Sequence, residues 1–70
     1  MKYLESKKDI ASGELVIKGT RIRIAQIIAM LANNYTIDKI HGEWFPHLST
    51  QVLKGSLEEA AEQFSTKLHA

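Results

Sequence analysis

The apolar residues that follow Ile24 recur with the helical period, and this constrains the fold more than any other feature of the chain. In the segment IAQIIAMLA they fall at i, i+3, i+4 and i+7, the pattern of an amphipathic helix, and predict a helix over about 24–33. Asn34 lies where this helix should end, and asparagine tolerates the left-handed conformation found at helix C-termini.

Two further helices are predicted from the residues that start and stop them. Thr36 is a good N-cap and Pro46 a stop signal, so the sequence predicts a short helix over about 36–44. Ser49 is the N-cap of a third helix, predicted over about 49–68. The apolar side of this longest helix is formed by Leu53, Leu57, Ala60, Ala61, Phe64 and Leu68.

The first third of the chain has no helical period. Residues 1–11 are polar and lysine-rich, which predicts a flexible arm. Lys18-Gly19 separates two short β-prone runs, so we expect a hairpin over about 14–22. A lone two-stranded hairpin is marginal in water, and a second copy of the chain is the simplest partner. The expected dimer interface is therefore Leu15, Val16, Ile17, Thr20, Arg21 and Ile22.

Length and composition limit what else the chain can be. Its 70 residues allow one small domain, predicted over 12–70, and the absence of cysteine excludes disulfides and cysteine-ligated zinc. The histidines have no metal-binding spacing, so we expect no metal and no cofactor. The sequence begins with charges and has no long apolar run, which predicts a soluble, cytoplasmic protein.

These elements predict a mainly α fold, a small trihelical helix-turn-helix domain with a short N-terminal β-hairpin. DNA binding is the commonest role of such a unit. With Leu53 and Leu57 facing inward, the outward residues near the start of the third helix are those that can bond base edges or phosphates. The expected DNA contacts are Ser49, Thr50, Gln51 and Lys54, with His47 in the turn and Arg23 as a phosphate contact.

Each of these residues also has a simpler explanation. Polar residues on an exposed helix face are common in any soluble protein, and a turn histidine such as His47 is more often only solvated. Glu58 and its acidic neighbours would repel phosphate, so they should lie beyond the groove or face a protein. Gly55 and Ser56 are small enough for a dimer or partner contact, and equally for simple crowding in the core.

The segments GELVIKGTRIRI, IIAMLANNYTIDKI and FPHLSTQVL resemble a widespread prokaryotic family, number 433 among the domains of unknown function. The family pattern runs "G.pvi.GTRi.v", an amphipathic helix, "G.s.eei" and "yP.ls...v..al.ya", and the similarity covers about Asp9 to Phe64. It departs at Asn34, where the family commonly has glycine, and in the helix before Pro46, which is about one residue longer.

The resemblance implies a winged or homeodomain-like helix-turn-helix. Because some members are antitoxins paired with PIN-domain-like ribonuclease toxins, it also implies a dimeric, self-repressing DNA-binding protein with a toxin partner. The GTR triplet is typical of the family whatever its target, which favours a structural role for Arg21 and leaves Arg23 as the better phosphate contact. A protein-interaction module of the same fold, without specific DNA binding, is the alternative.

The stretch VIKGTRI does not predict an enzyme. A phosphate-binding P-loop needs more glycines and a Gly-Lys-Ser/Thr ending before a helix, and this stretch has neither. No nucleophile in the chain has a credible base beside it in the sequence. A hairpin turn needs only Gly19, so we interpret the stretch as a turn and expect no enzymatic activity.

Overall fold

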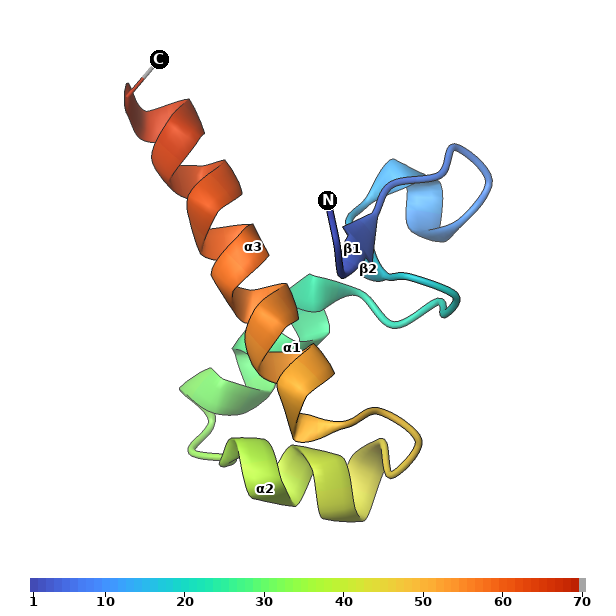
Figure 1. Cartoon of the computed structure of the whole chain (residues 1–70), viewed down its shortest axis with the longest axis vertical. Helices are drawn as coiled ribbons and strands as arrows, with labels where there is room; N and C mark the ends of the chain where they lie inside the picture. The colour runs from blue at the N-terminus through green and yellow to red at the C-terminus, as the bar shows by residue number, and fades with distance from the viewer. Residues whose placement is uncertain (70) are drawn as a thin grey trace.

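Three helices cross one another beside a small two-stranded sheet (Figure 1). The computed structural model describes residues 1–69, and the side chains of residues 1–65. The helices are α1 (Ile24–Ala32), α2 (Ile37–Lys39) and α3 (Thr50–His69). α2 continues directly into a π-helical turn, η2 (Ile40–Trp44). The predicted mainly α, trihelical fold is therefore confirmed.

The sheet differs from the predicted one. Strand β1 (Leu4–Glu5) pairs antiparallel with β2 (Val16–Ile17), with Leu4 opposite Ile17. The chain does turn at Lys18-Gly19, where the Thr20 amide donates to the Ile17 carbonyl at 3.0 Å and Gly19 has a φ of +76°. The residues after the turn pair back onto β2 through a bridge between Val16 and Arg23, and the Ile17 amide donates to the Ile22 carbonyl at 3.0 Å. The chain is therefore hairpin-like across this turn, as predicted, but the run after the turn is not a second strand of the sheet.

The prediction of a flexible arm over residues 1–11 was wrong at β1. Leu4 is only 1% exposed and belongs to the hydrophobic core. After it, the Ser6 hydroxyl donates to the Gly13 carbonyl and closes the loop between the strands, which includes a 3-10 turn at Ala11–Gly13. β2 therefore pairs with the N-terminal segment of its own chain.

The predicted helix ends are confirmed. The Thr36 hydroxyl accepts from the Lys39 amide at 3.1 Å, and the Ser49 hydroxyl accepts from the Val52 amide at 3.1 Å. Asn34 has a φ of +71° after α1. There the Asn34 amide donates to Leu31 and the Tyr35 amide to Met30, the two bonds of a Schellman motif.

The core lies where α1, η2, α3 and the sheet meet. Ile27, Ile40 and Leu53 are fully buried there and join the three helices. The helical spacing of Trp44 from the buried Ile40 favours a buried Trp44, but Trp44 is 51% exposed, because the Phe45 amide bonds to the Ile40 carbonyl in an i→i+5 turn. This turn adds one residue between core positions, so Phe45 packs against the core instead.

α3 is longer than the body on which it packs. Its second half projects away from α1, α2 and the sheet toward the C-terminus (Figure 1). Phe64, predicted on the apolar side of this helix, is consequently 51% exposed. Within the described part of the chain, no helix is long and apolar enough to cross a membrane.

Candidate nucleic-acid interface

The helix-turn-helix unit is formed by α2 with η2, a short turn, and the start of α3. Ile40 and Leu53 are both 0% exposed and hold the two helices together. His41, which was not among the predicted site residues, holds the turn in place: its Nδ1 donates to the Leu48 carbonyl at 2.5 Å. Since Leu48 is itself buried, the turn is fixed at both the backbone and the side chain.

Most of the predicted DNA contacts lie exposed around the start of α3. His47, Ser49, Gln51 and Lys54 are exposed, whereas Thr50 is partly buried. The Ser49 hydroxyl is occupied by its bond to the Val52 amide, so its role is that of a helix cap. The His47 ring lies edge-on to the Phe45 ring at 6.3 Å between centroids, and its imidazole is open to solvent.

A surface hollow brings three of these residues together. Thr50, Gln51 and Lys54 line a depression of about 380 Å³ with Tyr3, Gly55 and Glu58. The structure therefore assembles Gln51 and Lys54 on one face of the first two turns of α3. A side chain can contact a base edge in the major groove only if it projects from the exposed face of the recognition helix, as Gln51 and Lys54 do.

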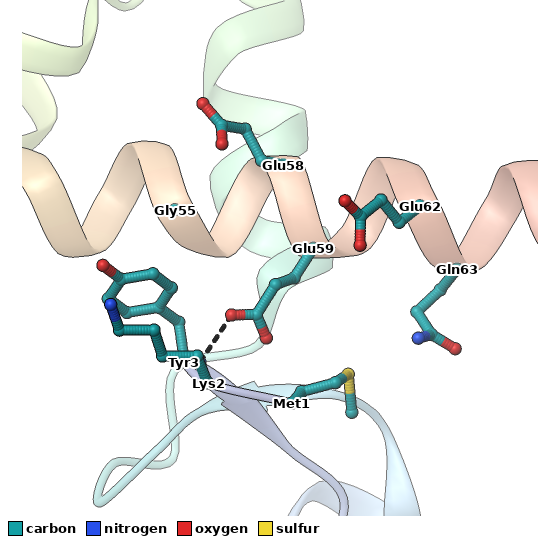
Figure 2. Close-up of a pocket in the computed structure, with 8 residues that line it drawn as sticks. All are labelled: Met1, Lys2, Tyr3, Gly55, Glu58, Glu59, Glu62 and Gln63. Atoms are coloured by element: carbon teal, nitrogen blue, oxygen red, sulfur yellow. Dashed lines mark hydrogen bonds between the residues drawn. The ribbon is translucent and has the colours of Figure 1, made fainter.

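Tyr3 is the residue of this face that sequence reasoning missed. Its ring lies against the backbone of α3 at Gly55, so closely that a Cβ on Gly55 would overlap the ring carbons (Figure 2). Lys2 lies over the same ring, with its Nζ 5.2 Å from the ring centroid. The only signal in the sequence was Gly55 itself, since a glycine inside a helix marks a close approach. The alternatives left open for Gly55 resolve to contact within the chain.

The acidic residues of α3 lie next to this face. Glu59 accepts from the amides of Tyr3, at 2.6 Å, and Leu4, at 3.2 Å, and so fastens the start of β1 to the helix (Figure 2). Glu58 lines the hollow of Gln51 and Lys54. It also lines a second hollow of about 340 Å³, on the other side of Tyr3, together with Glu59 and Glu62. The carboxylates of α3 all lie between Glu58 and Glu62, so its first two turns carry none.

The two arginines of the turn region do not join this face. The Nε atom of Arg23 lies 3.5 Å from a carboxylate oxygen of Glu14, and both side chains are about half exposed. Arg23 precedes α1 beside β2, and none of its described bonds involves α2, the turn or α3. Arg21 is exposed and makes no hydrogen bond or ion pair within the described residues. A bond from Arg21 to a second subunit stays a prediction.

The predicted dimer interface stays a prediction, but two of its six side chains are buried within a single chain. Val16 is 0% and Ile17 2% exposed inside a single chain, so neither is available to a second copy. The Thr20 hydroxyl is used locally: it donates to the Ile17 carbonyl at 2.7 Å and accepts from the Ile22 amide at 3.0 Å. Leu15 and Ile22 pack partly against the same core.

Comparison with known proteins agrees with the sequence resemblance. The family model described as "Protein of unknown function (DUF433)" matches residues 4–60, which is more than half of the chain. The matched range includes β1 and ends within α3. No curated protein and no solved structure matches the chain significantly. On the family match, the chain belongs to the DUF433 family of proteins of unknown function.

Proposed function

We propose that this protein is a cytoplasmic, non-enzymatic DNA-binding protein that reads its operator with the start of α3. The observation that carries the proposal is the joint exposure of Gln51 and Lys54 at the end of a helix-turn-helix unit, opposite the buried Leu53. Glutamine pairs with adenine in the major groove, and lysine reaches guanine or a phosphate. Lys2 lies over the ring of Tyr3, which lines the hollow of Gln51 and Lys54, so a second positive charge is close to this face.

The proposed biological role is that of a dimeric antitoxin that represses its own gene and neutralises a PIN-domain-like ribonuclease. This part of the proposal rests on the family resemblance. The two activities use different surfaces: the first turns of α3 for DNA, and the acidic part around Glu58 and Glu62 for a basic patch on the toxin. Carboxylates repel DNA, which supports this division of α3.

The test is fluorescence anisotropy with the DNA directly upstream of the gene, against scrambled DNA, at two salt concentrations. Lys54→Ala should weaken binding to both DNAs and lower the salt slope by about one, since one phosphate contact is lost. Gln51→Ala should reduce the preference for the operator, by about 1–3 kcal/mol. Gln63→Ala is the matched control, because it removes the same side chain from an exposed position about three turns further along α3.

A protein-interaction module without specific DNA binding is the second candidate. The observation in its favour is Glu58, which lines the same hollow as Gln51 and Lys54 and would repel a phosphate there. Equal, weak binding of wild type to both DNAs would reject the DNA-binding proposal and favour this candidate. The next experiment would then be a binding assay with the protein encoded by the neighbouring gene.

A further inference from the structure

Tyr3 is held in one position, yet its hydroxyl group is free. The Tyr3 amide donates to Glu59 at 2.6 Å, and its carbonyl accepts from the Lys18 amide at 2.9 Å. The ring lies on the backbone of α3 at Gly55. Among the described residues, by contrast, none forms a hydrogen bond with the Tyr3 hydroxyl. Tyr3 therefore presents a hydrogen-bond donor whose position the fold has already fixed.

The Tyr3 hydroxyl and the ammonium group of Lys2 point the same way. In Figure 2 both groups lie toward the start of α3, on the side away from Glu62 and Gln63. Lys2 Nζ lies 5.2 Å from the centre of the Tyr3 ring, a distance at which the face of an aromatic ring attracts a cation. A hydroxyl donor and a positive charge are thus brought together by two adjacent residues.

This pair adjoins the hollow of Gln51 and Lys54. Tyr3 forms part of the wall of that hollow, and Lys54 is exposed there. Lys2 and Lys54 therefore bring two positive charges close to Tyr3. Of the six residues that line the hollow, Glu58 is the only carboxylate, and in Figure 2 its side chain leaves α3 on the side away from Tyr3.

We propose that Lys2 and Tyr3 together bind a phosphate of the DNA backbone, next to the bases that Gln51 contacts. This inference rests on the proposed DNA-binding function. A phosphate oxygen accepts hydrogen bonds and carries negative charge, so it suits a phenol hydroxyl and an ammonium group at once. Such contacts fix the register of a protein on the duplex, and this pair would set the position from which Gln51 reaches a base. Both residues precede the range 4–60 of the family match, which therefore assigns them no role.

The packing of the ring does not explain the hydroxyl. Only ring carbons of Tyr3 lie against Gly55, so a phenylalanine would cover this part of α3 equally well. A side chain that is already ordered also loses little conformational entropy when it binds a ligand. Both points favour a contact made by the hydroxyl itself.

Tyr3→Phe tests the hydroxyl, because it keeps the ring on α3. In the anisotropy assay it should weaken binding to operator and scrambled DNA alike, by about tenfold, since both carry the same phosphates. It should leave the salt slope unchanged, because a phenol has no charge. Tyr35→Phe is the matched control: it removes the same group from a ring that packs edge-on against Trp44 and lines neither hollow beside Tyr3. In urea both variants should unfold at the same concentration as wild type.

Lys2→Gln tests the charge. It should weaken binding to both DNAs and lower the salt slope by about one, as expected for one lost phosphate contact. The preference for the operator should remain, in contrast to Gln51→Ala. Lys8→Gln is the matched control, because it removes the same charge from the exposed loop between β1 and β2, which lies away from the start of α3 (Figure 1).

Nuclear magnetic resonance provides a measurement on the unaltered protein. The chain has two tyrosines, so isotope-labelled tyrosine gives ring signals from Tyr3 and Tyr35 alone. Tyr3→Phe assigns them. Operator DNA should shift the Tyr3 signals and leave those of Tyr35 in place.

The outcomes separate this inference from the proposed function. If wild type prefers the operator but Tyr3→Phe or Lys2→Gln binds as tightly as wild type, the phosphate contact is overturned and the DNA-binding function stands. Tyr3 signals that do not move on addition of the operator lead to the same conclusion. If wild type binds neither DNA, both proposals are rejected.

Discussion

Gly55 is the point at which the N-terminal segment meets α3, and it has no room for a side chain. Gly55→Ala should displace the Tyr3 ring and destabilise the protein by about 1–2 kcal/mol, although alanine is the better helix former by about 1 kcal/mol. Urea denaturation measures the difference. In a Tyr3→Ala background, Gly55→Ala should cost much less stability, because the added Cβ no longer overlaps the Tyr3 ring.

Gly42 supplies the matched control for this prediction. An added Cβ there meets no atom within 4 Å, and its φ is not in the positive range. Gly42→Ala should therefore be neutral or stabilise the protein by up to about 1 kcal/mol. If the two substitutions had equal effects on the free energy of unfolding, the close contact between Tyr3 and α3 would be disproved.

Glu59 fastens β1 to α3 through two backbone amides. Glu59→Gln keeps one acceptor oxygen and loses the charge, so it should cost about 1–2 kcal/mol of stability. The same loss of stability should make hydrogen exchange of the Tyr3 and Leu4 amides faster. Glu58→Gln is the control on the neighbouring, exposed position and should stay within about 0.5 kcal/mol of wild type.

At the scale of elements, the end of α1 depends on a residue that adopts a left-handed conformation. Asn34 has a φ of +71° in the Schellman motif, where glycine is unstrained. Asn34→Gly should therefore be neutral or stabilising, whereas Asn34→Ala should cost about 1 kcal/mol. Thermal unfolding followed by circular dichroism distinguishes these outcomes, and an alanine variant as stable as the glycine variant would contradict this account.

The two strands show where prediction of elements from this sequence fails. The period of a strand is two residues, and β1 and β2 have two residues each, so neither strand can show a period. The glycine turn at Lys18-Gly19 was predictable from local chemistry. The partner of β2 was not, because the pairing of Leu4 with Ile17 depends on the position of α3 and the bonds from Glu59.

At the scale of the whole molecule, the proposed dimer links stability to concentration. A partner that binds only the folded chain raises its apparent stability by mass action. The Tm of wild type should therefore rise with protein concentration. Calorimetry at several concentrations measures this, and a wild-type Tm that is independent of concentration would count against the dimer.

The sequence by itself determined the helices, their caps and the helix-turn-helix unit. These features depend on contacts within a few residues: the apolar period after Ile24, the hydroxyls of Thr36 and Ser49, and the left-handed Asn34. It also identified the exposed face with Gln51 and Lys54, because the helical period that turns Leu53 toward the core turns these two residues toward solvent.

Only the tertiary structure decided what lies beside those residues. It brought Tyr3 to the face of Gln51 and Lys54, buried Val16 and Ile17 within one chain, and left Arg23 with Glu14. Each of these contacts joins residues that are distant in sequence or depends on which side of an element faces the core. Local propensity carries no information about such contacts, since burial and packing between elements determine them.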